Sequence, residues 1–147
     1  MAKHHIKDIR AFNRFYTDVA GLVDQHILNS RYSLPEVRVL YEMYYTGAST
    51  ANEIISIIHI DKGYLSRILL KFEKEKLISK KRSAKDARAI LLSLTVKGRD
   101  EFEKLDIAAH NQVKEILSQL PKEKHDELVF HMNEIKKILH SKINQDK

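Results

Sequence analysis

Basic side chains gather in one part of this 147-residue chain, the stretch from Asp61 to Arg88. The stretch holds ten of the 26 Lys and Arg residues but four of the 20 Asp and Glu residues. The 16 basic and 16 acidic residues elsewhere cancel, so the whole net charge of +6 belongs to this stretch. Such segregation predicts a polyanionic partner. A charged face that is merely solvated is the alternative interpretation.

The first part of the stretch, about residues 61–76, has the periodicity of an amphipathic helix. One side is apolar and should pack inward; it carries Leu65, Ile68, Leu69 and Phe72. On the other side, Arg67 can bond O6 and N7 of guanine, and Ser66 can reach a base or a phosphate. Gly63 lets the helix N-terminus approach an anion, and Leu70 can touch a thymine methyl or pack beneath the next element. An ordinary amphipathic helix with solvated basic residues is the alternative.

The second part, about residues 77–95, alternates with period two and predicts a hairpin with a polar connection at residues 83–87. The apolar side of its second strand should carry Ile90, Leu92 and Leu94. The basic tip of this hairpin can reach a minor groove or its phosphates, because narrow AT-rich grooves attract arginine. Asp86 and Arg88 lie two apart. On an extended strand both side chains project from one face, so we expect the Asp86 carboxylate to orient the Arg88 guanidinium.

Helical patterns fill the rest of the chain. Apolar residues at steps of three and four predict a helix over residues 4–29 and two long helices separated by Pro121. Ser33 with Glu36, and Thr50 with Glu53, have capping-box spacing and predict the starts of two further helices. Gly47 should end the first of these two helices. The sequence therefore predicts a mostly α protein with a small β-hairpin, in which helices at residues 50–76 form a helix-turn-helix and the hairpin is its wing.

Several classes of site and location are disfavoured by composition. The chain has no cysteine, which excludes thiolate metal sites and thiol redox sensing. Its eight histidines show no metal-binding spacing, and no glycine-rich loop or nucleophile elbow indicates an enzyme or a cofactor. No apolar run is long enough to span a membrane, and no secretory signal is visible, so we expect a cytoplasmic location without a membrane partner.

The run "DKGYLSRILLKFEKEKLISKKRSAKDARAILLSLTVKG" resembles the MarR family of bacterial winged-helix transcription regulators. The similarity rests on the pattern "YLSRIL…FEKEKLI", on Asp86 and Arg88 in the wing, and on the closing L-T-x-x-G at Leu94, Thr95 and Gly98. Upstream, "YSLPEVRVL" looks like the family's helix entry. Lys76 departs from the pattern, because a glycine commonly precedes the Leu-Ile step.

The resemblance covers essentially the whole chain and implies a homodimeric regulator, expected to be a repressor, of pseudo-palindromic promoter DNA. Residues 1–32 and 99–147 are then the dimerisation region, and residues 33–98 the DNA-binding region. A winged helix that binds protein instead of DNA is the alternative function. The candidate DNA-binding residues are Lys62, Gly63, Tyr64, Ser66, Arg67, Lys71, Lys80, Lys81, Arg82, Lys85, Asp86 and Arg88.

A small anionic or aromatic effector is a further expectation, because regulators of this kind are often released by a signal. Four tyrosines offer either the lining of an effector pocket or ordinary packing: Tyr32, Tyr41, Tyr44 and Tyr45.

Overall fold

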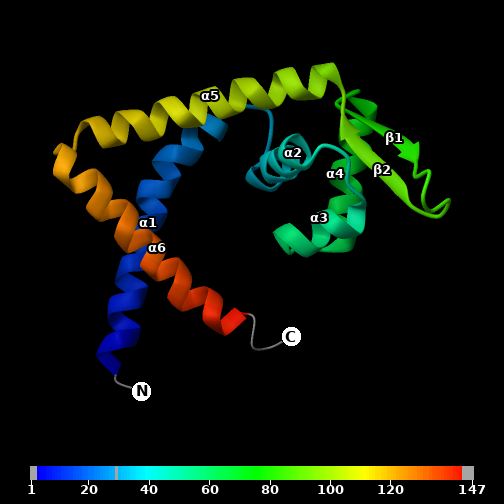
Figure 1. Cartoon of the computed structure of the whole chain (residues 1–147). Helices are drawn as coiled ribbons and strands as arrows, with labels where there is room; N and C mark the ends of the chain where they lie inside the picture. Colours follow the sequence, from blue (N-terminus) through cyan, green and yellow to red (C-terminus); the bar gives the residue numbers. More distant parts are fainter. Residues whose placement is uncertain (1–2, 29, 144–147) are drawn as a thin grey trace. The chain divides into compact units, whose positions relative to one another are not determined.

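The computed structural model describes residues 3–28 and 30–143 of the chain (Figure 1). In this part the elements follow in the order α1 (Lys3–Leu28), α2 (Leu34–Thr46), α3 (Ala51–Ile58), α4 (Lys62–Lys74), β1 (Ile78–Arg82), β2 (Ile90–Leu94), α5 (Val96–Ser118) and α6 (Lys122–Ile143). The predicted fold class, mostly helical with one hairpin, is confirmed. The chain divides into two compact units, Met1–His110 and Asn111–Lys147, and the boundary falls within α5.

Local capping fixes where the short helices begin. The Glu36 amide donates to the Ser33 hydroxyl at 3.4 Å, and the Glu36 carboxylate accepts from the Ser33 amide at 3.0 Å. Thr50 and Glu53 form the same reciprocal pair, with donor–acceptor distances of 3.2 and 3.1 Å. The Asp61 carboxylate accepts from the Tyr64 amide at 2.9 Å and starts α4. These bonds satisfy amide groups that a helix start otherwise leaves free. The caps predicted at Ser33 and Thr50 are confirmed.

Helices α2, α3 and α4 share one apolar core with the hairpin and the start of α5. The side of α4 predicted to face inward is buried, with Phe72 fully enclosed and Leu65 exposed by 1%. Other members of the core come from the neighbouring elements: Val39, Leu40, Met43, Ile54, Ile58, Leu77, Leu92, Leu94, Phe102 and Leu105. Burying these side chains is the main free-energy source for holding α4 against the other helices.

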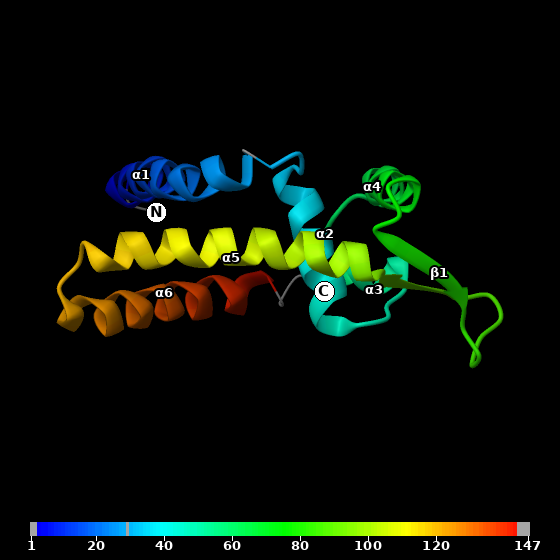
Figure 2. The ribbon, with the colours of Figure 1, turned by 90° about the horizontal axis from the view of Figure 1, so that it is seen from above.

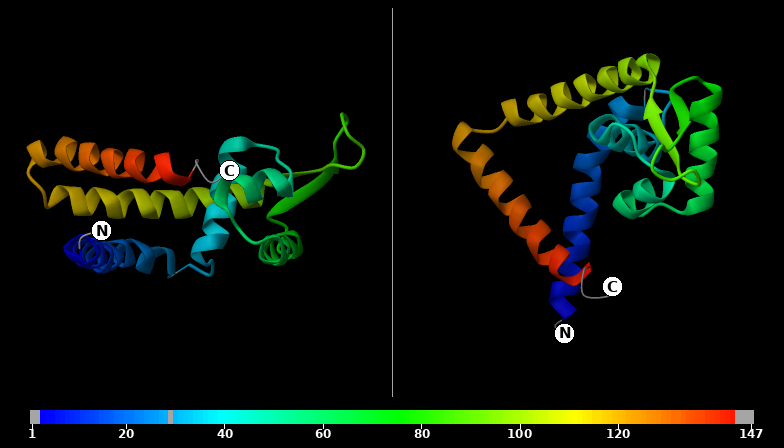
Figure 3. Two further views of the ribbon diagram at one scale, coloured as in Figure 1. Left: turned by 90° about the horizontal axis from the view of Figure 1, so that it is seen from below. Right: turned by 45° about the vertical axis from the view of Figure 1, so that its right-hand side comes forward.

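The hairpin pairs β1 with β2 in antiparallel register, from Ile78 opposite Leu94 to Arg82 opposite Ile90. Its inner end is tied to the helices, because Ser49 and Leu92 exchange backbone hydrogen bonds at 3.0 and 2.7 Å. Its outer end projects beyond the helices, as Figures 2 and 3 show. Ile90, expected on the apolar side of the strand, is 51% exposed because it lies at that outer end.

The hairpin and α5 are locked to the end of α4 by a close approach at Gly98. A β-carbon at this position would lie 2.1 Å from the Leu77 carbonyl oxygen, so only glycine fits. The Thr95 hydroxyl donates to the Lys76 carbonyl at 2.7 Å and accepts from the Gly98 amide at 3.1 Å. Lys76 has a φ of 60°, the left-handed conformation that the expected glycine would adopt freely.

Two long helices expose apolar faces, each within its own unit. On α1, Phe15 is 64% exposed, and Ile6, Ile9, Phe12 and Tyr16 are exposed as well. On α6, the exposed apolar residues include Leu128, Val129, Phe130, Met132, Ile135, Ile138 and Leu139. Residues 1–2, 29 and 144–147 of the predicted dimerisation region lie outside the described residues. No described helix is long and apolar enough to cross a membrane.

Candidate nucleic-acid interface

The outer side of α4 consists of the residues that the sequence predicted to face a groove. Lys62, Gly63, Ser66 and Arg67 are exposed, while Tyr64 is half-buried. Leu70 is 62% exposed and therefore does not pack beneath the hairpin. The surface combines a cation that can bond a base edge bidentately, small polar groups, and one aliphatic side chain. That set of side chains suits the major groove of DNA.

Neighbouring groups on α4 orient two of these side chains. The Arg67 guanidinium carbon lies 5.6 Å from the centre of the Tyr64 ring, one helical turn earlier, within the range of a cation–π contact. The Ser66 hydroxyl donates to the Lys62 carbonyl at 3.0 Å, which leaves its lone pairs available as acceptors. A β-carbon at Gly63 would stand 3.2 Å from the Asp61 carboxylate that caps the helix. Gly63 therefore keeps the capped N-terminus uncrowded.

Lys71 occupies a different position from the other basic residues of α4. Its ammonium donates to both carboxylate oxygens of Glu36, at 2.9 and 3.0 Å. The Lys71 side chain is 38% exposed and the Glu36 side chain 13%. The sequence identified Glu36 as a cap of α2 but gave no sign of this second role, because 35 residues separate the two partners.

An ion pair joins the hairpin to α4. The Lys80 ammonium lies 2.8 Å from a carboxylate oxygen of Glu73 on α4, and β1 packs beside that helix. The charge of Lys80 is therefore paired with a carboxylate of the protein itself. The contact brings the two basic segments of the sequence next to each other (Figure 1). Lys81, Arg82, Lys85 and Arg88 are exposed along the hairpin and its loop.

The Asp86 carboxylate bonds the backbone of the loop and not, as expected, the guanidinium of Arg88. Residues 83–89 form a turn between the strands, so Asp86 and Arg88 do not lie on an extended strand as expected. The Asp86 carboxylate accepts a hydrogen bond from the Arg88 amide at 2.9 Å, and the Ala89 amide donates to the Asp86 carbonyl at 3.0 Å. A turn of this kind is a common role of aspartate, whose short side chain reaches the amide two residues later.

The four tyrosines suggested for an effector pocket differ in their surroundings. Tyr32 is 3% exposed and donates its hydroxyl proton to Glu101 at 3.1 Å. Burial raises the pKa of Tyr32. Tyr44 packs on Phe102, and its hydrogen bond to Glu103 raises the pKa of its phenol. Tyr41 and Tyr45 are largely exposed.

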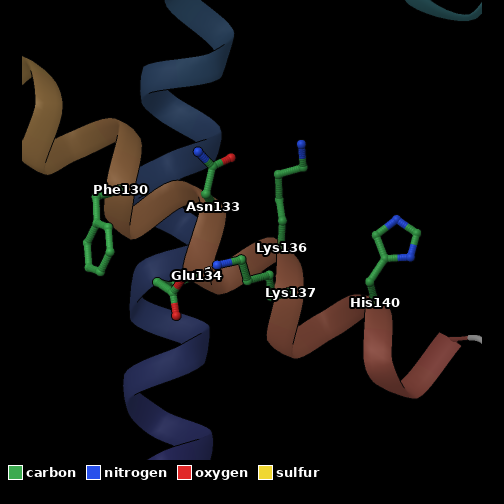
Figure 4. A pocket seen from close by; sticks show the side chains of 6 residues that line it. All are labelled: Phe130, Asn133, Glu134, Lys136, Lys137 and His140. Carbon is green, nitrogen blue, oxygen red and sulfur yellow. Dashed lines mark hydrogen bonds and ion pairs between the residues drawn. The ribbon is translucent and has the colours of Figure 1, made fainter.

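Two hollows in the described part of the chain are lined by residues other than Tyr32, Tyr41, Tyr44 and Tyr45. One of about 230 Å³ lies between the start of α2 and the turn from α3 to α4, where Arg38, His59 and Tyr64 border it. The other, of about 400 Å³, is lined by Phe130, Asn133, Glu134, Lys136, Lys137 and His140. Figure 4 shows all six of these side chains projecting from α6 alone. This second hollow is thus one face of an exposed helix and not an enclosed pocket.

Metal-binding side chains do not gather within residues 3–28 and 30–143. No group of three or more His, Asp or Glu side chains is arranged to hold an ion in this part of the chain.

Sequence comparison relates the chain to transcriptional regulators. Residues 25–105 match the model of the family described as transcriptional regulator SarA/Rot. The HTH-type transcriptional regulator BilQ of Clostridium symbiosum is 31% identical over 93 residues. That alignment covers 61% of this chain and 65% of BilQ, slightly less than two thirds of the relative's own length.

Structure comparison identifies the fold of the MarR regulators, as the sequence resemblance implied. Wild-type MarR of E. coli superposes with a TM-score of 0.74 at 16% identity, covering 86% of this chain and 93% of MarR. A MarR mutant complexed with operator DNA gives a TM-score of 0.73 at 16% identity, with coverages of 90% and 95%. YusO of Bacillus subtilis gives 0.72 at 19% identity, with coverages of 93% and 98%.

Proposed function

We propose that this chain, which belongs to the SarA/Rot family of transcriptional regulators, binds promoter DNA as a homodimer and represses transcription until a small molecule releases it. The family consists of regulators and not of enzymes, in agreement with the sequence. One observation carries the DNA-binding part of the proposal. The outer side of α4 presents Ser66, Arg67 and Leu70 to solvent, and the basic hairpin lies directly beside it.

In this proposal α4 enters the major groove. Arg67 bonds O6 and N7 of a guanine, and its cation–π contact with Tyr64 limits the orientations of the guanidinium before binding. Lys62 and the free amides near Gly63 meet a phosphate, because helix N-termini favour anions. Phosphate contacts set the register of the helix on the duplex, and base contacts supply the sequence preference.

The hairpin loop binds the neighbouring minor groove and its phosphates. Lys81, Arg82 and Lys85 neutralise phosphates, and Arg88 enters the groove, where a narrow AT-rich segment concentrates negative potential. Asp86 holds the loop backbone in the shape that presents Arg88. The relative whose structure includes operator DNA, a MarR mutant, supports a duplex as the partner of this fold.

Dimerisation follows from the exposed apolar faces of α1 and α6. Faces of this length, with side chains such as Phe15 and Phe130 at least 60% exposed, typically mark an interface. A second copy of the chain is the partner we propose, because regulators that read pseudo-palindromic sites are two-fold symmetric. The dimerisation region comprises residues 1–32 and 99–147, and the DNA-binding region residues 33–98.

Release by a small anionic or aromatic molecule completes the proposal. The chain has no cysteine, so oxidation of a thiol is not available as the signal. Because the target is chromosomal promoter DNA, the proposed location is the cytoplasm.

Fluorescence anisotropy with duplexes that the protein selects from a random-sequence pool tests the proposal. The wild type should bind with a strong salt dependence. Arg67→Ala should weaken binding to the selected duplex by about 1–3 kcal/mol and reduce the preference for it over other sequences. Lys114→Ala removes an exposed charge of α5 outside the candidate nucleic-acid interface and serves as the matched control. Because Lys114 lies in the proposed dimerisation region, sedimentation should first show that the variant has the oligomeric state of the wild type; it should then bind DNA like the wild type.

Lack of salt-dependent binding to any duplex contradicts the proposal and leaves the protein-binding winged helix as the interpretation.

A further inference from the structure

The ammonium of Lys71 is paired with a carboxylate of the protein, although its side chain is 38% exposed and Lys71 belongs to the helix proposed to contact DNA. It donates to both oxygens of the Glu36 carboxylate, at 2.9 and 3.0 Å. Glu36 is 13% exposed, so its charge has little water to solvate it if the lysine leaves. Removing one partner of a poorly solvated pair costs more free energy than the pair itself contributes.

The Glu36 carboxylate has a fixed position. One of its oxygens accepts from the Ser33 amide at 3.0 Å, as the second half of the capping box that begins α2. The carboxylate therefore cannot follow Lys71 if α4 turns or slides. Lys71 is in effect bonded to the first turn of α2.

An aromatic ring completes the surroundings of the Lys71 ammonium. The nitrogen lies 5.7 Å from the centre of the Tyr32 ring, within the range of a cation–π contact. Tyr32 is itself immobilised, because its ring packs edge-on against Phe72 of α4 and its hydroxyl bonds Glu101 of α5. Lys71 thus has two attractive partners, the capping carboxylate of Glu36 and the ring of Tyr32, which belongs to the apolar core.

We infer that Lys71 is a positioning residue, which fixes the rotation of α4 through Glu36, and that it does not contact DNA phosphate. The inference rests on the proposed function. Arg67 lies one turn before Lys71 on the same helix, so a rotation that the Lys71–Glu36 pair prevents would move Arg67 in the groove. The pair is electrically neutral as a unit, and Lys71 therefore adds nothing to the counterions that DNA binding releases.

The salt dependence of DNA binding separates positioning from phosphate contact. The probe is a duplex that the wild type selects from a random pool. Lys71→Met keeps the length of the side chain and removes its charge; it should weaken binding about threefold to tenfold and leave the slope of log affinity against log salt unchanged. Lys85→Met in the exposed loop is the matched control. Its slope should become shallower by about 0.9, the value for one lost phosphate contact.

For Glu36→Gln, the inference and simple charge attraction predict opposite changes in DNA affinity. Glutamine retains an acceptor for the Ser33 amide, so the cap of α2 survives while the ion pair is lost. We expect weaker DNA binding, although the variant is more positive than the wild type and frees Lys71. The double variant should bind about as weakly as either single variant, because both remove the same contact. Lys71→Arg, which keeps the charge and can still bond Glu36, should restore most of the affinity.

Two results overturn the inference: a slope for Lys71→Met that falls as it does for Lys85→Met, or tighter binding by Glu36→Gln. Urea unfolding of the wild type, Lys71→Met, Glu36→Gln and the double variant tests the pair without DNA, since the two substitutions should be non-additive in their effect on the free energy of unfolding. Additive effects in urea refute the linkage between Lys71 and Glu36. Absence of DNA binding by the wild type, by contrast, refutes the proposed function.

Discussion

Replacing Asp86 in the hairpin loop tests the proposed DNA interface. Loss of its hydrogen bond to the backbone should weaken DNA binding, whereas loss of its negative charge should strengthen it. The carboxylate of Asp86 accepts from the Arg88 amide at 2.9 Å, and further bonds close the loop from Ser83 to Ala89. Asp86→Ala removes both the charge and this acceptor. Asp86→Asn removes the charge but keeps an oxygen in the same place. Comparison of the two variants therefore isolates the hydrogen bond.

The magnitudes of the two effects decide the expected order of affinities. A net contribution of about 1 kcal/mol is typical for one such hydrogen bond. Removing an acid about 8 Å from a phosphate favours binding by about 0.5 kcal/mol in water. Asp86→Asn should then bind slightly tighter than the wild type, and Asp86→Ala slightly weaker. The two variants should differ by about 1 kcal/mol, or roughly fivefold in affinity.

Fluorescence anisotropy at low and high salt measures these differences on one duplex. Because salt screens the charge effect but not the hydrogen bond, the advantage of Asp86→Asn over the wild type should shrink at high salt. The gap between Asp86→Asn and Asp86→Ala should persist. Equal affinities of the two variants would show that the loop backbone does not depend on Asp86, and our account of the loop would be refuted.

Three further predictions concern backbone fit and base contact. Lys76→Gly should raise the free energy of unfolding by about 1 kcal/mol in urea titrations, because a φ of 60° strains any side chain; no gain would contradict this. Gly98→Ala should lower it by about 1–3 kcal/mol, since the new β-carbon meets the Leu77 carbonyl; an unchanged urea midpoint would contradict it. Replacing thymine by uracil in the selected duplex should weaken wild-type binding by about 0.8 kcal/mol but leave Leu70→Ala unaffected, if the exposed Leu70 covers a thymine methyl. Equal losses for both proteins would exclude that contact.

Local patterns in the sequence predicted the elements well. Ser33 with Glu36, and Thr50 with Glu53, identified two helix starts because a capping box depends on residues three apart. Leu92 and Leu94 identified the buried side of β2 through strict alternation. In each case the physical cause lies within a few residues, and a single sequence displays it directly.

The contacts that position the candidate site could not be predicted in the same way. Glu36 bonds Lys71 across 35 residues, and Lys80 bonds Glu73 through the packing of β1 on α4. Composition marks all of these residues as charged but does not say which of them form ion pairs with each other in the folded chain. Asp86 illustrates a related difficulty. Its spacing from Arg88 fits a side-chain pair, whereas the loop geometry gives it a backbone partner.

The central claim is that two copies of α4 read a symmetric site on duplex DNA. Selection of duplexes from a random-sequence pool by the wild-type protein, followed by sequencing of the bound fraction, tests it most directly. The account predicts an enriched inverted repeat whose half-site centres lie about 10 base pairs, or one helical turn, apart. Enrichment of a single unpaired half-site, or of no sequence at all, would contradict the account.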